Sequence, residues 1–136
     1  MALLADDKLG AGREVVADPP LPAYFAAFDA IAADARHLLV VAEDGGGGLV
    51  GTLQLTIIPG LSDQGADLAL IKAVRVAAGL RSQGLGTILM DWALAEARRR
   101  GCSKVELMTH QSRTAAQRFY ERLGFAKTHV GMKREV

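Results

Sequence analysis

A glycine-rich loop, residues 79–87, contains residue types that can bind an anion. An apolar run over residues 68–76 leads into this loop, and the loop opens directly into an amphipathic pattern. Gly84 and Gly86 lack a Cβ, so the backbone can turn tightly and a ligand can approach it closely. The first amides of a helix have no intrahelical partner and lie at the positive end of its dipole, where a phosphate can bind them. Arg81 adds a cation whose forked donors suit phosphate oxygens.

The loop alone does not distinguish a phosphate site from an ordinary turn between a strand and a helix. Its spacing lacks the Gly-Lys-Ser/Thr of a P-loop, and its glycines do not make the dinucleotide pattern G-x-G-x-x-G. A second pattern lies downstream, where residues 119–125 are Phe-Tyr-Glu-Arg-Leu-Gly-Phe. The distance between the two patterns fits one helix and one strand.

Together the two patterns resemble the GCN5-related N-acetyltransferase (GNAT) superfamily. Arg81-x-x-Gly84-x-Gly86 matches that family's acetyl-coenzyme A motif, and residues 119–125 match its C-terminal helix–strand signature. The resemblance extends from about Leu38 to the end of the chain. It implies an acyltransferase that moves an acetyl group from acetyl-coenzyme A to a primary amine of a small molecule, or less readily of a peptide. By the same resemblance, transfer is direct and occurs in a ternary complex.

The resemblance also implies particular site residues. Tyr120 stands at the place of the family's usual general acid, because a phenol is protonated at neutral pH and can donate to a departing thiolate; packing in the core would suit it as well. The strand before the loop is expected to splay from its neighbour and to offer backbone groups to the pantetheine amides and the thioester carbonyl. Arg113 replaces an asparagine that contacts the cofactor in many relatives. The residues expected to bind acetyl-coenzyme A are Val74, Arg75, Val76, Arg81, Ser82, Gln83, Gly84, Leu85, Gly86, Thr87 and Arg113.

The expected general base is missing from its usual place. Relatives commonly carry a glutamate on the strand before the loop, and Lys72 stands there in this chain. A charged lysine cannot accept a proton. The substitutes are His110, which titrates in the right range, Glu106 and Asp67, and water with bulk base is a further alternative. Two other hypotheses therefore stay open: an acetyl-coenzyme A-binding module with weak or no activity, and a folded remnant that binds no ligand.

The order of elements predicts an α/β (α+β) fold with a mixed, mostly antiparallel central sheet flanked by helices. By resemblance this is the acyl-CoA N-acyltransferase fold with its N-terminal strand missing, because the chain begins inside the first helix. Residues 1–136 are expected to form one N-acetyltransferase domain. Expected helices cover residues 1–9, 23–35, 84–100 and a stretch ended by Gly124, and expected strands cover 37–43, 49–58, 67–76, 104–109, 125–129 and 132–136. The helix over 84–100 carries the apolar residues Leu85, Ile88, Leu89 and Trp92.

Composition and charge narrow the classes of function. The chain has 136 residues, 23% of them charged, and a formal net charge of +1, which gives no electrostatic footprint for nucleic acid or for an anionic membrane. The basic triplet over residues 98–100 fits a solvated helix end better than a nucleic-acid site. No apolar run reaches transmembrane length and no signal segment is present, so a cytoplasmic location is expected. The single cysteine, Cys102, excludes an internal disulfide and a cysteine-rich metal site, and no metal is expected. An exposed sheet edge would recruit a partner, so a homodimer is expected.

Overall fold

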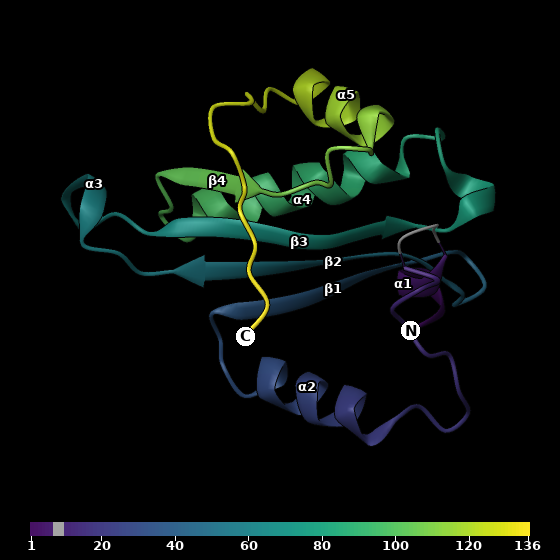
Figure 1. The fold of residues 1–136 in the computed structure, drawn as a ribbon. Helices are drawn as coiled ribbons and strands as arrows, with labels where there is room; N and C mark the ends of the chain where they lie inside the picture. Colours follow the sequence, from purple (N-terminus) through teal and green to yellow (C-terminus); the bar gives the residue numbers. More distant parts are fainter. Residues whose placement is uncertain (7–9) are drawn as a thin grey trace. The chain divides into compact units, whose positions relative to one another are not determined.

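The computed structural model describes residues 1–6 and 10–136, which form two compact units, residues 1–106 and 107–136. In chain order the elements are α1 (Ala2–Ala5), α2 (Pro22–Ala32), β1 (His37–Glu43), β2 (Leu49–Ile58), α3 (Ser62–Gly65), β3 (Leu68–Val76), the 3₁₀ helix η1 (Ala78–Leu80), α4 (Leu85–Arg99), β4 (Lys104–Leu107) and α5 (Thr114–Arg122) (Figure 1). The helix expected over residues 1–9 is α1, which ends at Ala5, and residues 7–9 lie outside the described part of the chain.

Four strands form one sheet in the order β1-β2-β3-β4. β1 and β2 form the expected antiparallel hairpin, with Val40 opposite Leu53, and β2 is also antiparallel to β3. β4 begins beside the start of β3, because the Ser103 amide donates to the Asp67 carbonyl at 3.0 Å. The predicted fold class, a mostly antiparallel sheet flanked by helices, is therefore confirmed.

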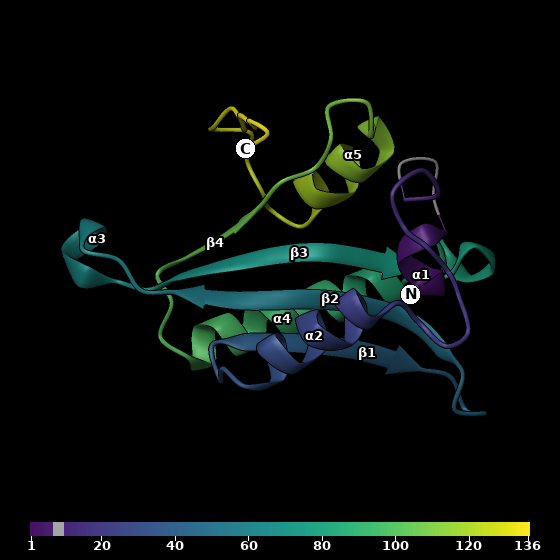
Figure 2. The ribbon, with the colours of Figure 1, turned by 60° about the horizontal axis from the view of Figure 1, so that its bottom comes forward.

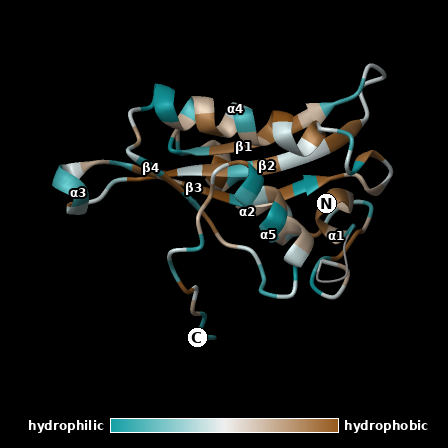
Figure 3. Ribbon diagram, turned by 90° about the horizontal axis from the view of Figure 1, so that it is seen from above, coloured by the Kyte–Doolittle hydropathy of each residue, from teal (hydrophilic) through white to brown (hydrophobic). Residues whose placement is uncertain are grey.

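The core of the first unit lies between the sheet and α4, which runs along the strands (Figure 2). The sheet contributes apolar side chains to this core, and Figure 3 shows the strands as mostly hydrophobic while the C-terminal end of α4 is hydrophilic. Gly51 of β2 lets the helix approach closely, because a Cβ at that position would lie 2.9 Å from Leu89 Cδ1. The buried apolar residues are Leu53, Leu55, Ile57, Ala69, Ile71, Leu89, Met90, Ala93 and Ala97.

The buried face of α4 differs from the one that its large apolar residues suggest. Met90, Ala93 and Ala97 are buried, whereas Ile88 is 65% exposed and Trp92 is 39% exposed. The small alanine side chains allow close packing of the helix against the sheet, and a bulky side chain at their positions would keep the two apart. Close packing, rather than side-chain size, therefore sets which face of α4 is buried.

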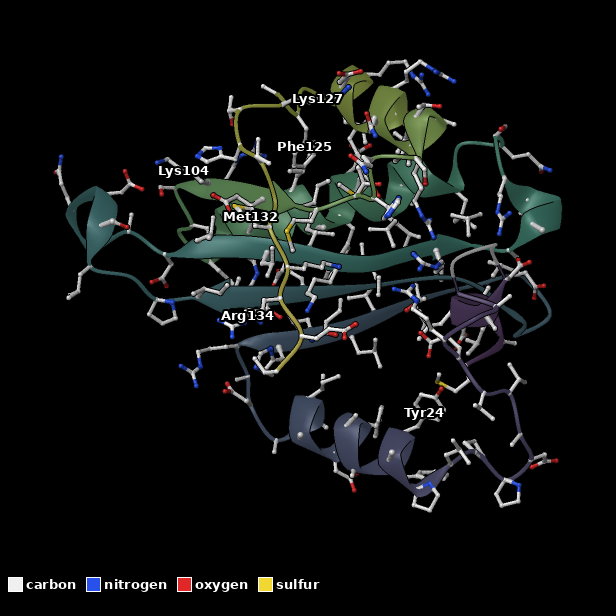
Figure 4. The ribbon with its side chains drawn as sticks, viewed as in Figure 1. Tyr24, Lys104, Phe125, Lys127, Met132 and Arg134 are labelled. Carbon is white, nitrogen blue, oxygen red and sulfur yellow. The ribbon has the colours of Figure 1, made fainter. Side chains whose placement is uncertain are left out.

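The two strands expected over residues 125–129 and 132–136 are not formed, and the prediction is wrong there. α5 is followed by Gly124, whose φ is 89°, and the residues after it are in neither helix nor strand. Val130 is 89% exposed and Met132, labelled in Figure 4, is 90% exposed. A strand is stabilised by hydrogen bonds to a neighbouring strand and by burial of one face, and a short stretch of sequence supplies neither by itself.

Candidate active site

The loop between β3 and α4 has the backbone shape that the glycine spacing predicted. Gly84 has φ 88° and ψ −13°, a left-handed conformation, at the N-cap of α4. A Cβ at Gly84 would meet nothing within 4 Å, so glycine is required there by the backbone angle and not by crowding. The Ile88 amide donates to the Gly84 carbonyl at 3.1 Å, and the amides of residues 85–87 therefore precede the intrahelical ladder. This arrangement fits an anion such as a pyrophosphate.

The side chains of the loop make local contacts that hold its shape. Arg81, Ser82 and Gln83 are exposed. Ser82 also has a positive φ of 62°, which is an unfavourable backbone conformation for a residue with a Cβ. Gln83 Nε2 donates to the Gly79 carbonyl at 2.9 Å. The loop is thus closed on itself ahead of the helix.

Asp6 is a contact of this loop that the sequence did not reveal. Its Oδ2 accepts a hydrogen bond from the Ala78 amide at 2.9 Å and lies 3.1 Å from Arg81 Nη2. Arg81 Nη2 also donates to the Asp6 carbonyl oxygen, and Arg81 Nε donates to the Val76 carbonyl at 3.0 Å. The guanidinium that was expected to face a phosphate is therefore bonded to the end of β3 and to Asp6, the C-cap of α1.

A β-bulge interrupts β3 shortly before the loop. Gln54 lies opposite Lys72 and Thr52 lies opposite Arg75, so two residues of β3, Ala73 and Val74, correspond to the single residue between Thr52 and Gln54. Ala73 has a positive φ of 53°. Bulges bend a strand and redirect its side chains. A glycine would have indicated this bulge in the sequence, but the residue with the positive φ is an alanine.

The strand after the bulge remains paired with β2. Val76 lies opposite Gly51, and Arg75 lies opposite Thr52. Arg75 Nη1 donates to the Val74 carbonyl at 2.8 Å. A splay of residues 74–76 would consequently be on the side of β4, which has 4 residues against the 9 of β3.

Tyr120, the expected general acid, belongs to the second unit and lies in an aromatic cluster on α5. Its ring centroid is 5.2 Å from that of Phe119 and 6.1 Å from that of Phe125. Phe125, labelled in Figure 4, follows the helix, and its amide donates to the Tyr120 carbonyl at 3.1 Å. The ring is half-buried, so the geometry within this unit accommodates both a packing role and a catalytic one.

His110, one of the base candidates, has a nitrogen engaged within its own loop. The Ser112 amide donates to His110 Nδ1 at 3.2 Å, and Ser112 Oγ lies 2.7 Å from the same atom. A neutral ring that accepts at Nδ1 carries its proton on Nε2. To act as a base, His110 would have to give up these contacts. Arg113, the N-cap of α5, donates its amide to the His110 carbonyl at 2.9 Å.

The remaining base candidates are on the first unit. Glu106, on β4, is exposed, and Asp67 is half-buried just before β3. Lys72, at the expected position of the family's glutamate, is exposed. The buried environment that would favour an uncharged lysine is therefore not present at this position.

The Cys102 thiol also bears on the chemistry of the first unit. Burial and the nearby Asp67 raise the pKa of the Cys102 thiol, so this cysteine is not an activated nucleophile. Among residues 1–6 and 10–136, no group of three or more His, Cys, Asp or Glu side chains is placed to hold a metal ion. Over the same residues, no helix has the length and apolarity needed to cross a membrane.

The comparison with protein families gives a match to the acetyltransferase (GNAT) family over residues 4–125. Among solved structures, a transcriptional regulator of Bacillus halodurans C-125 is 41% identical, with a TM-score of 0.96 over 99% of this chain and 89% of that one. An acetyltransferase of Trypanosoma brucei is 28% identical, with a TM-score of 0.74 over 87% of this chain and 82% of that one.

One curated relative is named for its enzymatic activity. The aminoalkylphosphonate N-acetyltransferase of Salmonella typhimurium is 42% identical over 50 residues, which are 37% of this chain. The match spans only 32% of the length of that relative.

Proposed function

The chain belongs to the acetyltransferase (GNAT) family, and we propose that it moves an acetyl group from acetyl-coenzyme A to a primary amine of a small molecule, by direct transfer in a ternary complex. As a member of this family it is an acyltransferase, and acetyl-coenzyme A is the cosubstrate that the family implies. The loop between β3 and α4 carries the proposal, because a left-handed glycine there precedes a helix N-terminus. Such an arrangement binds a pyrophosphate through backbone amides.

Each part of the proposed site has a chemical role. Acetyl-coenzyme A supplies a thioester whose carbonyl carbon an amine can attack. The loop amides from Ser82 to Thr87 hold the pyrophosphate, and backbone groups of residues 74–76 bind the pantetheine and polarise the carbonyl. Arg113 assists at a phosphate or an amide of the cosubstrate. Tyr120 donates a proton to the sulfur as it leaves.

The acceptor is proposed as a small primary amine, because the curated relative is named for an aminoalkylphosphonate. The general base is His110 or Glu106 in this proposal. The exposure of Glu106 on β4 favours it, whereas the Ser112 contacts of His110 count against the ring in its present state.

A second candidate function is an acetyl-coenzyme A-binding module with weak or no turnover. The observation that favours it is the exposed Lys72 at the expected position of the base. Both functions require the same loop, so cosubstrate binding does not separate them and turnover does.

The name of the Bacillus halodurans relative raises the question of nucleic-acid binding. The basic end of α4 does not favour that function here. Arg99 and Arg100 both bind the Glu96 carboxylate, at 2.7 and 2.6 Å, and Arg100 Nη1 also donates to the Ala35 carbonyl at 2.7 Å. These contacts support a structural role for the basic end of the helix.

We further propose that residues 1–136 act as one catalytic domain, which is cytoplasmic and forms a homodimer. The family match over residues 4–125 includes parts of both compact units, which supports a single domain. Light scattering on the purified protein measures the assembly, and a mass of one chain would contradict the dimer.

The first test measures acetyl-coenzyme A binding by calorimetry in the wild type and in Gly86→Glu. A glutamate in the first turn of α4 suits the helix dipole, but its carboxylate repels a pyrophosphate, and a thermal melt checks that the variant is folded. We expect binding in the wild type and none in Gly86→Glu. Gly86→Ala is the matched control and should retain binding. Absence of binding to the wild type would refute the proposed function.

The second test separates the enzyme from the binding module. The wild type is incubated with acetyl-coenzyme A and a panel of primary amines, beginning with aminoalkylphosphonates, and thiol release is measured. With an accepted amine, intersecting initial-rate lines indicate a ternary complex. Tyr120→Phe keeps both ring contacts, so coenzyme A affinity should be retained while turnover falls by about 100-fold or more. Binding without turnover of any amine would favour the module, and an unchanged rate in Tyr120→Phe would assign the ring to packing alone.

A further inference from the structure

The contact between Asp6 and the cosubstrate loop has no part in the proposed chemistry and joins segments far apart in the sequence. We propose that Asp6 is a positioning residue: its carboxylate and carbonyl hold the Arg81 guanidinium and the Ala78 amide, and thereby fix the loop that takes the pyrophosphate. This inference rests on the proposed function. It assigns to Asp6, at the C-cap of α1, a share in cosubstrate affinity.

The Arg81 side chain is held in place by hydrogen bonds to two separate segments of the first unit. Its side chain bonds three acceptors, the Val76 carbonyl through Nε and the carbonyl and carboxylate of Asp6 through Nη2. Val76 is the last residue of β3, and Asp6 is the C-cap of α1. The guanidinium thus ties together three parts of the first unit at the point where the loop begins.

The Ala78 amide is the second group of the loop that Asp6 holds. It is the first amide of η1, and it donates to Asp6 Oδ2 at 2.9 Å. The Leu80 amide then donates to the Ala77 carbonyl at 2.9 Å, which closes the turn. The Asp6 carboxylate therefore contacts the Ala78 amide at the start of the turn and the Arg81 side chain at its end. One carboxylate thus orients both ends of the turn.

The location of α1 supports this coupling. α1 contacts β2 and β3, and Figures 1 and 2 show it at the end of the sheet where β3 leads into η1. Gly10 is buried, and a Cβ there would lie 2.0 Å from the Leu4 carbonyl oxygen. Gly10 is thus packed closely against the end of α1, beside Asp6.

A positioning role and a competing role predict opposite results. If Asp6 positions the loop, removing its charge weakens coenzyme A binding. If Asp6 instead occupies Arg81 in place of the pyrophosphate, removing its charge strengthens binding. The two bonds of Arg81 to backbone carbonyls favour positioning, because turning the side chain toward a phosphate would break them along with the ion pair.

The experiment is a double-mutant cycle on coenzyme A affinity in the full-length protein, with Asp6→Asn, Arg81→Gln and both changes together. We expect Asp6→Asn to raise the Kd for coenzyme A by about tenfold, as for the loss of a charge-assisted contact. In the Arg81→Gln background, Asp6→Asn should raise the Kd by clearly less than it does in the wild type, because only the direct contact of Asp6 with the Ala78 amide then remains to be lost. Asp6→Glu should recover most of the affinity.

The matched control is Asp63→Asn, which removes an exposed ion pair with Lys104 (2.7 Å; Figure 4) at the end of the sheet opposite α1. Its Kd should equal that of the wild type. Both variants should melt close to the wild type, because exposed ion pairs contribute little stability. An unchanged or lower Kd in Asp6→Asn, or equal effects in both backgrounds, overturns the positioning role while the proposed function stands. No binding to the wild type overturns the proposed function itself.

Discussion

The helices α4 and α5 begin after loops that carry candidate site residues and end before glycines with positive φ, yet they are stabilised differently. α4 buries four residues, Leu89, Met90, Ala93 and Ala97, against the sheet, whereas none of the described residues of α5 is buried. Gly101 and Gly124, which follow the two helices, have φ 79° and 89°. The same local termination signals therefore serve a helix with four buried residues and a helix whose described residues are all at least partly exposed.

The difference extends to the candidate site residues. The loop before α4 is fixed by contacts across the sequence, from Asp6 to Arg81 and to Ala78. The loop before α5 is fixed by neighbours, since Gln117 Nε2 donates to the Gln111 carbonyl at 2.8 Å and Ser112 contacts His110. Loss of tertiary packing should therefore affect the cosubstrate loop more than the environment of Tyr120.

The largest effect should come from shortening a core side chain of α4. Met90 is fully buried, so Met90→Ala should lower the free energy of unfolding by about 2–5 kcal/mol through lost burial and a cavity. Leu123→Ala, at the half-buried C-cap of α5, should lower it by only about 1 kcal/mol. Urea denaturation of both variants measures the difference. Equal losses would show that α5 is packed as tightly as α4.

A smaller effect should follow from adding a Cβ at two glycines that share nearly the same left-handed backbone conformation. Gly84 has φ 88° and Gly124 has φ 89°, and a Cβ at either position would meet nothing within 4 Å. Gly84→Ala and Gly124→Ala should each lower stability by about 1 kcal/mol through backbone strain. Only Gly84→Ala should also weaken acetyl-coenzyme A binding, which calorimetry measures. Weaker binding in both variants to the same degree would mean that strain, not loop geometry, controls affinity.

The smallest effect should be a dependence of stability on pH at the C-terminal end of α4. Hydrogen bonds from Arg99 and Arg100 lower the pKa of Glu96 to about 2 from 4.5. Because the pKa is depressed in the folded state, this contribution is present above pH 4.5 and is lost as the pH falls toward 2. Glu96→Gln should remove that part of the acid-induced loss in denaturation curves recorded between pH 6 and pH 2. If the wild type and Glu96→Gln lose the same stability between pH 6 and pH 2, Glu96 contributes no net stability.

The sequence predicted the elements of the first unit well because their signals are local. The hairpin strands begin and end where expected, at residues 37–43 and 49–58, since two apolar runs flank a glycine-rich turn. The start of α4 was also located correctly, because Gly84 supplies the one backbone conformation that the turn requires.

Predictions that depended on a partner elsewhere in the chain were less successful. The strands expected after Gly124 are absent, because a strand needs hydrogen bonds to a neighbouring strand and a short stretch of sequence does not supply that neighbour. The bulge at Ala73 could not be predicted, since an alanine gives no sign that its φ will be positive. The buried face of α4 could not be predicted either, because it depends on the absence of a side chain at Gly51 on another element.

The sequence by itself determined the family, the fold class and the shape of the loop around Gly84, because each depends on residue types at fixed short spacings. Only the tertiary structure decided what holds Arg81. The guanidinium bonds to Asp6, 75 residues earlier in the chain, and to the end of β3. A contact over that separation forms when the sheet, α1 and the loop fold together, and no local pattern encodes it.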